Sequence, residues 1–105
     1  MQKELQLYEL LYLIDPSLTE SDSEAKTSFY CDFLTSRGSQ VMIQNRGKRS
    51  LSYKIRGCET GSYVQLIYLG NQKLRVSLDT EMGRDRFILR YMTIKVLPSI
   101  LPSLS

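Results

Sequence analysis

The segment of the sequence best suited to binding a ligand is "NRGKRSLSYKIRG", residues 45–57. It has no acidic side chain, and its cations are Arg46, Lys48, Arg49, Lys54 and Arg56. Each phosphate that such a cation neutralises releases a counterion, so the segment favours binding to RNA or another polyanion. Lys and Arg also protect an exposed sheet edge from pairing with other chains, and the segment alone leaves both interpretations open.

Catalytic groups are scarce in the sequence. It has no histidine, which excludes imidazole acid–base catalysis and histidine metal sites. It has no glycine-rich phosphate loop, and Cys31 and Cys58 stand in no metal-ligand or redox spacing. The carboxylates Glu20, Asp22 and Glu24 are interpreted as capping and favourable charges at a helix start, with an acid–base pair as the alternative. We therefore expect no enzyme activity, no cofactor and no metal site.

Charge is divided unevenly along the 105 residues, whose net charge is +3. Residues 1–38 hold three basic and seven acidic side chains, a balance of −4. Residues 39–105 hold eleven basic and four acidic side chains, a balance of +7, which favours a polyanionic partner. No apolar run approaches the roughly 20 residues of a membrane-spanning helix, and we expect no signal peptide or transit segment.

The hydrophobic pattern predicts six elements in the order strand, helix, strand, strand, helix, strand. The strands are expected at residues 5–14, 40–55, 62–69 and 87–96, and the helices at 19–37 and 71–83. Thr19 and Asn71 are predicted helix caps, and Gly38 is a predicted left-handed helix end. Gly47 is expected to make a bulge or bend in the second strand, and residues 56–61 to form a hairpin loop.

This order predicts an α+β fold, the ferredoxin-like split-βαβ sandwich, over residues 1–96 as one RNA-binding domain, with a loose tail at 97–105. Its four-stranded antiparallel sheet carries both helices on one face, with the first and third strands central and the basic second strand on an edge. The other sheet face is open and is expected to meet a protein neighbour. The apolar side chains predicted for that face are Leu11, Leu13, Val64, Leu66 and Tyr68. In the last strand Arg90 shares a face with Ile88, Met92 and Ile94, and the pattern leaves open which face is buried.

Four short motifs, in order along the chain, resemble one protein family. They are "YELLYLIDPSL" (8–18), "GKRSLSYKI" (47–55), "GSYVQLIYL" (61–69) and "ILRYMTIK" (88–95). With these spacings the sequence resembles the bacterial-type ribosomal protein S-six family of the small subunit. It departs from the family pattern at Arg46, where many members have Trp, and at Lys54, which replaces Pro.

The resemblance implies a structural component of the small ribosomal subunit, in a bacterial cytoplasm or a plastid (chloroplast) stroma. Such a protein would bind small-subunit ribosomal RNA together with the eighteenth protein of that subunit. The candidate RNA-binding residues are Arg46, Lys48, Arg49, Lys54, Arg56, Arg90 and Lys95. By position, the resemblance supplies Lys48, Arg49, Arg90 and Lys95, and charge alone supplies the other three.

Some alternatives stay open. Tyr8, Tyr53 and Tyr63 match family aromatic positions. Core packing is favoured for Tyr8 and Tyr63, and stacking on a base or on the partner protein is the alternative. A ligand-sensing or dimerising ferredoxin-like module would use the same open sheet face without a basic half. A hydrolase of the acylphosphatase type would need an arginine in its phosphate-cradling loop, whereas the first loop here is "DPSL".

Overall fold

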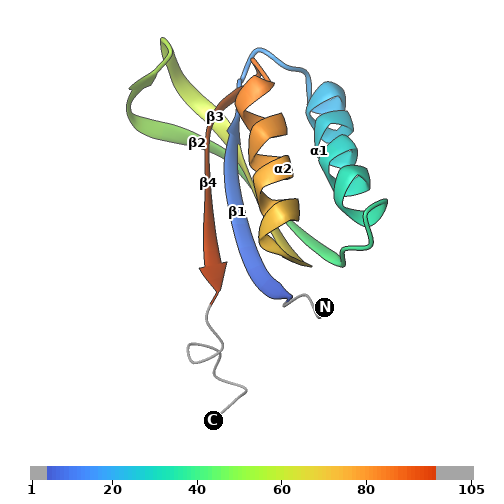
Figure 1. The fold of residues 1–105 in the computed structure, drawn as a ribbon. Coiled ribbons are helices and arrows are strands. Elements are labelled where there is room, and N and C mark those ends of the chain that lie inside the picture. Colours follow the sequence, from blue (N-terminus) through green and yellow to red (C-terminus); the bar gives the residue numbers. More distant parts are fainter. Residues whose placement is uncertain (1–4, 97–105) are drawn as a thin grey trace.

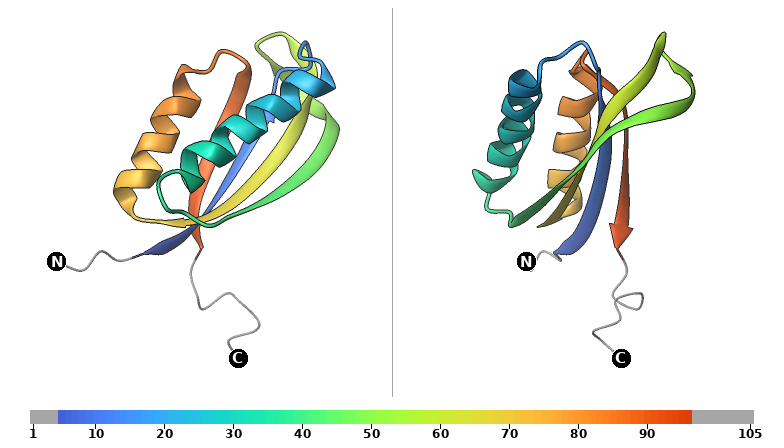
Figure 2. Two further views of the ribbon diagram at one scale, coloured as in Figure 1. Left: turned by 90° about the vertical axis from the view of Figure 1, so that its right-hand side faces the viewer. Right: turned by 180° about the vertical axis from the view of Figure 1, so that it is seen from behind.

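The computed structural model describes residues 5–96, which form a four-stranded antiparallel sheet with two helices on one face (Figures 1 and 2). The elements are β1 (Gln6–Ile14), α1 (Glu20–Thr35), β2 (Val41–Ile55), β3 (Cys58–Gly70), α2 (Gln72–Arg84) and β4 (Ile88–Val96). The strand order is β2-β3-β1-β4, which confirms the ferredoxin-like fold with the basic strand on an edge. Neither described helix is long and apolar enough to cross a membrane. The predicted tail at residues 97–105 lies outside the described residues.

The helix ends follow from local hydrogen bonding. The Thr19 hydroxyl accepts from the backbone N–H of Asp22 at 3.1 Å, and the Asn71 side chain accepts from the N–H of Leu74 at 2.8 Å. Both bonds satisfy donors that an α-helix leaves free in its first turn. Gly38 has a φ of +88° after α1, as expected for a left-handed helix end. These three predictions from the sequence are confirmed.

The hydrophobic core lies between the sheet and the helices. β1 supplies the side chains of its even positions, and α2 supplies Leu78 and Met82. α1 contributes Tyr30 and Leu34, both at most 1% exposed, whereas Phe29 on the same helix is 53% exposed. Burying one such large apolar side chain stabilises the fold by about 1.5–3 kcal/mol. The helices therefore cover one face of the sheet and leave the other uncovered.

Three of the five residues predicted for the open face lie in this core instead. Val64, Leu66 and Tyr68 pair across the sheet with core residues of β1 and are at most 2% exposed. Directly opposed residues of antiparallel strands point to the same side, so this set faces the helices. The prediction for these three was wrong, because both faces of β3 are rich in apolar residues and alternation does not say which one is buried.

The other two residues do lie on the open face. Leu11 is half-buried there, and Leu13 is fully buried beside Gly61. The register also places three exposed apolar side chains on this face: Met42 of β2, and Met92 and Ile94 of β4, exposed by 65%, 60% and 49%.

An irregularity in β4 explains why its alternation was ambiguous. Ile14 pairs with Ile88 while the preceding Leu13 pairs with Arg90, so Leu89 is an extra residue in the strand. Such a bulge reverses the alternation. Ile88 consequently packs in the core, whereas Arg90 and the even residues after it point to the open face.

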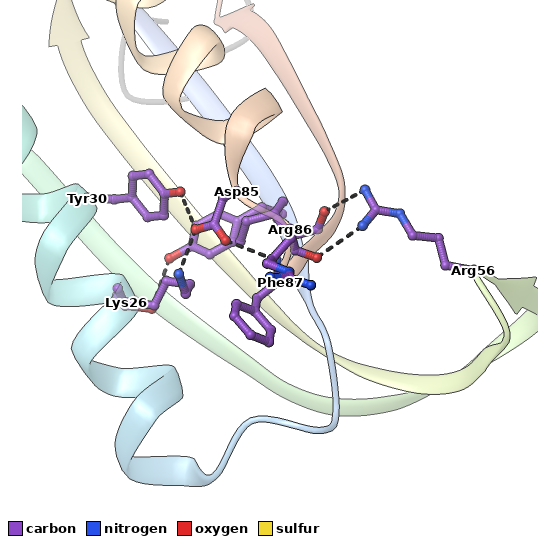
Figure 3. Close-up of polar contacts among 9 residues, drawn as sticks. Lys26, Tyr30, Arg56, Asp85, Arg86 and Phe87 are labelled. Atoms are coloured by element: carbon purple, nitrogen blue, oxygen red, sulfur yellow. Dashed lines mark hydrogen bonds and ion pairs between the residues drawn. The ribbon is translucent and has the colours of Figure 1, made fainter.

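The turn between α2 and β4 is fixed by one carboxylate (Figure 3). Asp85 accepts hydrogen bonds from Lys26 Nζ at 2.7 Å, the Tyr30 hydroxyl at 2.6 Å and the Phe87 N–H at 3.0 Å. Burial raises the pKa of Asp85, but the bonds from Lys26, Tyr30 and Phe87 outweigh burial and hold the pKa below its ordinary value. The Asp15 N–H also donates to the Phe87 carbonyl at 2.8 Å, so the turn is joined to both α1 and the end of β1.

Candidate nucleic-acid interface

The bulge predicted at Gly47 sets where the cations of β2 point. The register with β3 shifts between Asn45 and Gly47, Gly47 has a φ of +84°, and its N–H donates to the Asn45 side chain at 2.8 Å. Arg46 is left without a cross-strand partner. Its side chain and that of Arg49, three residues on, both lie on the open face, where they line one shallow cleft.

Arg46 belongs to a polar network in the middle of the open face. Its Nε and Nη2 donate to Gln65 Oε1 at 3.0 and 2.6 Å, and Gln65 Nε2 donates to the Glu9 carboxylate. Arg49 Nε donates to the Arg46 carbonyl at 3.2 Å, and neither of its terminal nitrogens makes a hydrogen bond within residues 5–96. The three side chains of the network come from three adjacent strands, β2, β3 and β1.

The tip of the β2–β3 hairpin is tighter than the sequence predicted. Ile55 pairs directly with Cys58, so the expected loop at residues 56–61 is a two-residue turn and β3 begins four residues earlier than predicted. Arg56 and Gly57 both have positive φ, +50° and +80°. That combination matches a type I′ turn, whose twist suits two paired strands.

Arg56 anchors this tip to the beginning of β4. Its Nη1 and Nη2 donate to the carbonyls of Arg86 and Ile88 at 3.0 and 3.1 Å (Figure 3). Arg90 Nη1, just beyond, donates to the Tyr53 hydroxyl of the hairpin at 3.1 Å. The planar guanidinium of Arg56 presents donors that suit two carbonyls. Because these donors bind backbone carbonyls, Arg56 positions the hairpin tip rather than offering a free cation to a ligand.

The seven candidate cations therefore do not form one surface. Arg46, Arg49 and Arg90 lie on the open face, and Lys54 and Arg56 lie at the tip of the β2–β3 hairpin. Lys48 and Lys95 lie on the helix side of the edge strands, since they pair with Ser62 and Tyr8. Within residues 5–96, Lys54 is the only one of the seven in an ion pair, 3.8 Å from Glu59. Both partners are more than 65% exposed, and such pairs contribute about 0–1 kcal/mol.

The structure adds one cation that the sequence did not single out. Arg86 is exposed in the turn that Arg56 binds, so its guanidinium lies at the same end of the sheet as the hairpin tip. Hydrophobic periodicity gives no information about a residue in a turn, so the sequence did not point to Arg86. What connects Arg86 with the basic segment is the hydrogen bond from Arg56, 30 positions away in the chain.

The structure separates the three tyrosines that match family positions by their exposure. Tyr8 is a core residue at 4% exposure, whereas Tyr53 is 64% exposed and Tyr63 is half-buried on the open face. Aromatic rings beside arginines are what single-stranded RNA-binding surfaces provide, because bases stack on the rings and phosphates meet the cations.

A family model described as ribosomal protein S6 matches residues 7–95. The chain belongs to the ribosomal protein S6 family. Members are structural components of the small ribosomal subunit, so the expectation that the chain is not an enzyme is confirmed by its family.

Curated relatives of the S6 family come from cyanobacteria and red algal plastids. Small ribosomal subunit protein bS6 of Gloeothece citriformis is 38% identical over 90 residues, covering 85% of this chain and 51% of that protein. The chain thus spans about half the length of that relative. Protein bS6c of Porphyra purpurea is 39% identical over 92 residues, covering 87% and 82%.

A solved structure agrees with the fold. The crystal structure of 30S ribosomal protein S6 from Thermotoga maritima superposes with a TM-score of 0.83 over 89% of each chain, at 18% identity. The agreement shows that the two chains share the ferredoxin-like fold.

Proposed function

We propose that this S6 family member binds small-subunit ribosomal RNA through the open face of its sheet, with the eighteenth small-subunit protein as its neighbour. The ribosome would be that of a bacterial cytoplasm or a plastid stroma. One observation carries the proposal: the guanidinium groups of Arg46, Arg49 and Arg90 lie with tyrosine side chains on the face that no helix covers.

The chemistry of this face suits a polyphosphate. Each arginine has five N–H donors, and within the part of the chain that the structure describes the hydrogen bonds of Arg49 and Arg90 use one nitrogen each. The remaining donors can contact phosphate oxygens, which fixes the position of the RNA without reading its sequence. Glu9 is the one acidic side chain lining the central cleft, and Gln65 binds its carboxylate.

The test compares two double variants that lose the same charge. Arg49→Ala/Arg90→Ala removes cations from the open face, and Lys73→Ala/Arg84→Ala removes exposed cations from α2. RNA affinity is measured across a salt series with a fragment of the central domain of the ribosomal RNA. The open-face variant should bind more weakly with a salt slope lower by about 1 per lost contact, while the α2 variant binds as wild type. Equal losses would refute the assignment, and self-association without RNA binding would favour a dimerising module.

A different surface suits the protein neighbour. A groove of about 600 Å³ runs between α1 and the edge strand β2. Ile43 and Lys48 of β2 line it together with three acidic residues, Asp15, Glu20 and Glu24. Its acidic excess disfavours phosphate and favours a basic polypeptide. Ile43 is 45% exposed, and an edge strand offers unpaired backbone groups to an added segment. We therefore place the eighteenth protein in this groove rather than on the open face expected from the sequence, with Lys48 facing the protein rather than RNA.

Two matched variants separate the groove from the open face. Ile43→Asp puts a charge into the groove, and Met92→Asp puts the same charge on an exposed position of the open face. Calorimetric titration with the eighteenth protein should show a loss of at least tenfold for Ile43→Asp and little change for Met92→Asp, since burying an unpaired charge costs several kcal/mol. The reverse order would place the neighbour on the open face.

A further inference from the structure

A cleft of about 360 Å³ lies on the open face across β1, β2 and β3, and it is lined by Glu9, Leu11, Arg46, Arg49, Tyr63 and Gln65. We propose that this cleft binds one unpaired nucleobase and prefers guanine. The inference rests on the proposed RNA-binding function and extends it from phosphate contact to recognition of a base. Phosphate contacts alone do not distinguish one RNA sequence from another, whereas a base-binding cleft on the open face would do so.

The polar groups of the cleft are held in place before any ligand arrives. Gln65 is only 8% exposed, and its side-chain amide is bonded at both ends. Its oxygen accepts from two nitrogens of Arg46 at 3.0 and 2.6 Å, and its NH₂ group donates to Glu9 Oε2. This fixes the amide orientation, because a flipped amide would put its NH₂ against the arginine and its oxygen against the carboxylate. Arg46 and Glu9 are thereby held on either side of Gln65.

The hydrogen-bonding capacity left over is acceptor capacity on Glu9, at one end of the Gln65 amide, and a donor on Arg46, at the other end. A carboxylate has about four lone-pair sites, and the contact with Gln65 uses one of them. Arg46 Nη1 makes no hydrogen bond within residues 5–96. Guanine is the RNA base whose Watson–Crick edge offers two adjacent N–H donors, N1 and N2, beside an acceptor, O6. The carboxylate of Glu9 suits the two donors, and the guanidinium of Arg46 suits O6.

The remaining residues of the cleft suit the rest of a nucleotide. Tyr63 offers a ring on which a base can stack, and such stacking contributes to the binding of any base. Leu11 adds apolar surface. Among the described residues the terminal nitrogens of Arg49 have no hydrogen-bond partner, so they suit the phosphate next to the bound base. Preference for one base then depends on Glu9 and Arg46, and overall affinity depends on Tyr63 and Arg49.

The experiment uses five-nucleotide RNAs with a single central G, A, C or U between uridines, titrated into the isotopically labelled full chain. Wild type should bind the G-centred RNA about tenfold more tightly than the A-centred one, as expected for a well-formed pair of hydrogen bonds. The NMR signals of the Gln65 side-chain amide should shift on binding. The matched variants are Glu9→Gln, whose amide oxygen can still accept from Gln65, and Arg49→Ala.

Glu9→Gln should abolish the preference for G while the salt slope stays unchanged. Arg49→Ala should lower the affinity for all four RNAs and the salt slope while the preference stays. Thermal melts check that both variants are folded. Salt-dependent binding of wild type without a preference for G, or a preference that survives in Glu9→Gln, overturns the base site and leaves the proposed function intact. Failure to bind the RNAs and the ribosomal RNA fragment alike overturns both.

Discussion

Replacing Asp85 by Asn should destabilise the protein strongly, because this one carboxylate joins α1 to the turn before β4. Its side chain is 11% exposed, and it accepts two hydrogen bonds from side chains, one of them from the ammonium of Lys26, which is 23% exposed. Hydrogen bonds that involve a charged group contribute about 1.5–3 kcal/mol each. The amide of Asn keeps one acceptor oxygen but loses the charge, so we expect the free energy of unfolding to fall by about 2–3 kcal/mol.

The loss is measured by urea unfolding and by the melting temperature. For a domain of this size, a loss of 2–3 kcal/mol lowers the melting temperature by roughly 10–20 °C. Asp32→Asn is the control, because Asp32 is an exposed carboxylate on the same helix as Lys26. A loss below about 0.5 kcal/mol, the usual range for surface substitutions, or one equal to that of Asp32→Asn, would refute the role given to Asp85.

The same substitution has a predicted pH dependence. The pKa of Asp85 is lowered in the folded protein, so its stabilising contribution is present above the unfolded value, about 3.9, and is lost as the pH falls through the folded value. The difference in stability between wild type and Asp85→Asn should therefore be constant near neutral pH and shrink in acid. A difference that grows as the pH is lowered below 4 would contradict this sign.

Three further substitutions test other contacts. Arg56→Lys keeps the charge but loses the two parallel N–H donors that hold the carbonyls of Arg86 and Ile88. Amide hydrogen exchange in residues 50–60 should therefore speed up by about tenfold, which corresponds to about 1.4 kcal/mol. Unchanged exchange would show that the hairpin tip does not depend on this contact. Tyr68→Phe removes a buried hydroxyl that has no hydrogen-bond partner within residues 5–96. The free energy of unfolding in urea should therefore stay unchanged or rise by up to about 1 kcal/mol. A clear loss would mean that the hydroxyl is hydrogen-bonded. Gly61→Ala places a methyl group 2.5 Å from Leu13 Cδ1 and should cost about 1–3 kcal/mol in the same assay, whereas a neutral result would show that the buried leucine can move aside.

Local signals in the sequence were enough to predict the fold. Side chains at Thr19 and Asn71 cap helices whichever tertiary structure surrounds them, and Gly38 and Gly47 mark backbone conformations that favour glycine. Hydrophobic periodicity supplied the order of the elements, and that order allows few topologies.

The faces of the strands were harder to predict than the strands themselves. Both faces of β3 are rich in apolar residues, so its sequence does not tell which face packs against the helices. The pairing with β1 determines that the face containing Leu66 is the buried one. In β4 a single extra residue, Leu89, reverses the alternation of side chains between the two faces, and the amino-acid composition of the strand does not reveal such a bulge. The same applies to the site, where the contacts of Arg46 with Gln65 and of Arg56 with Arg86 join residues 19 and 30 positions apart.

Ultraviolet cross-linking in assembled small-subunit particles tests the central claim most directly, with the modified peptides located by mass spectrometry. Cross-links to RNA should fall on the open face and the hairpin, at Tyr53, Tyr63 and the residues around Arg46 and Arg90. Cross-links confined to the outward surfaces of α1 and α2, with none on the open face, would contradict the account.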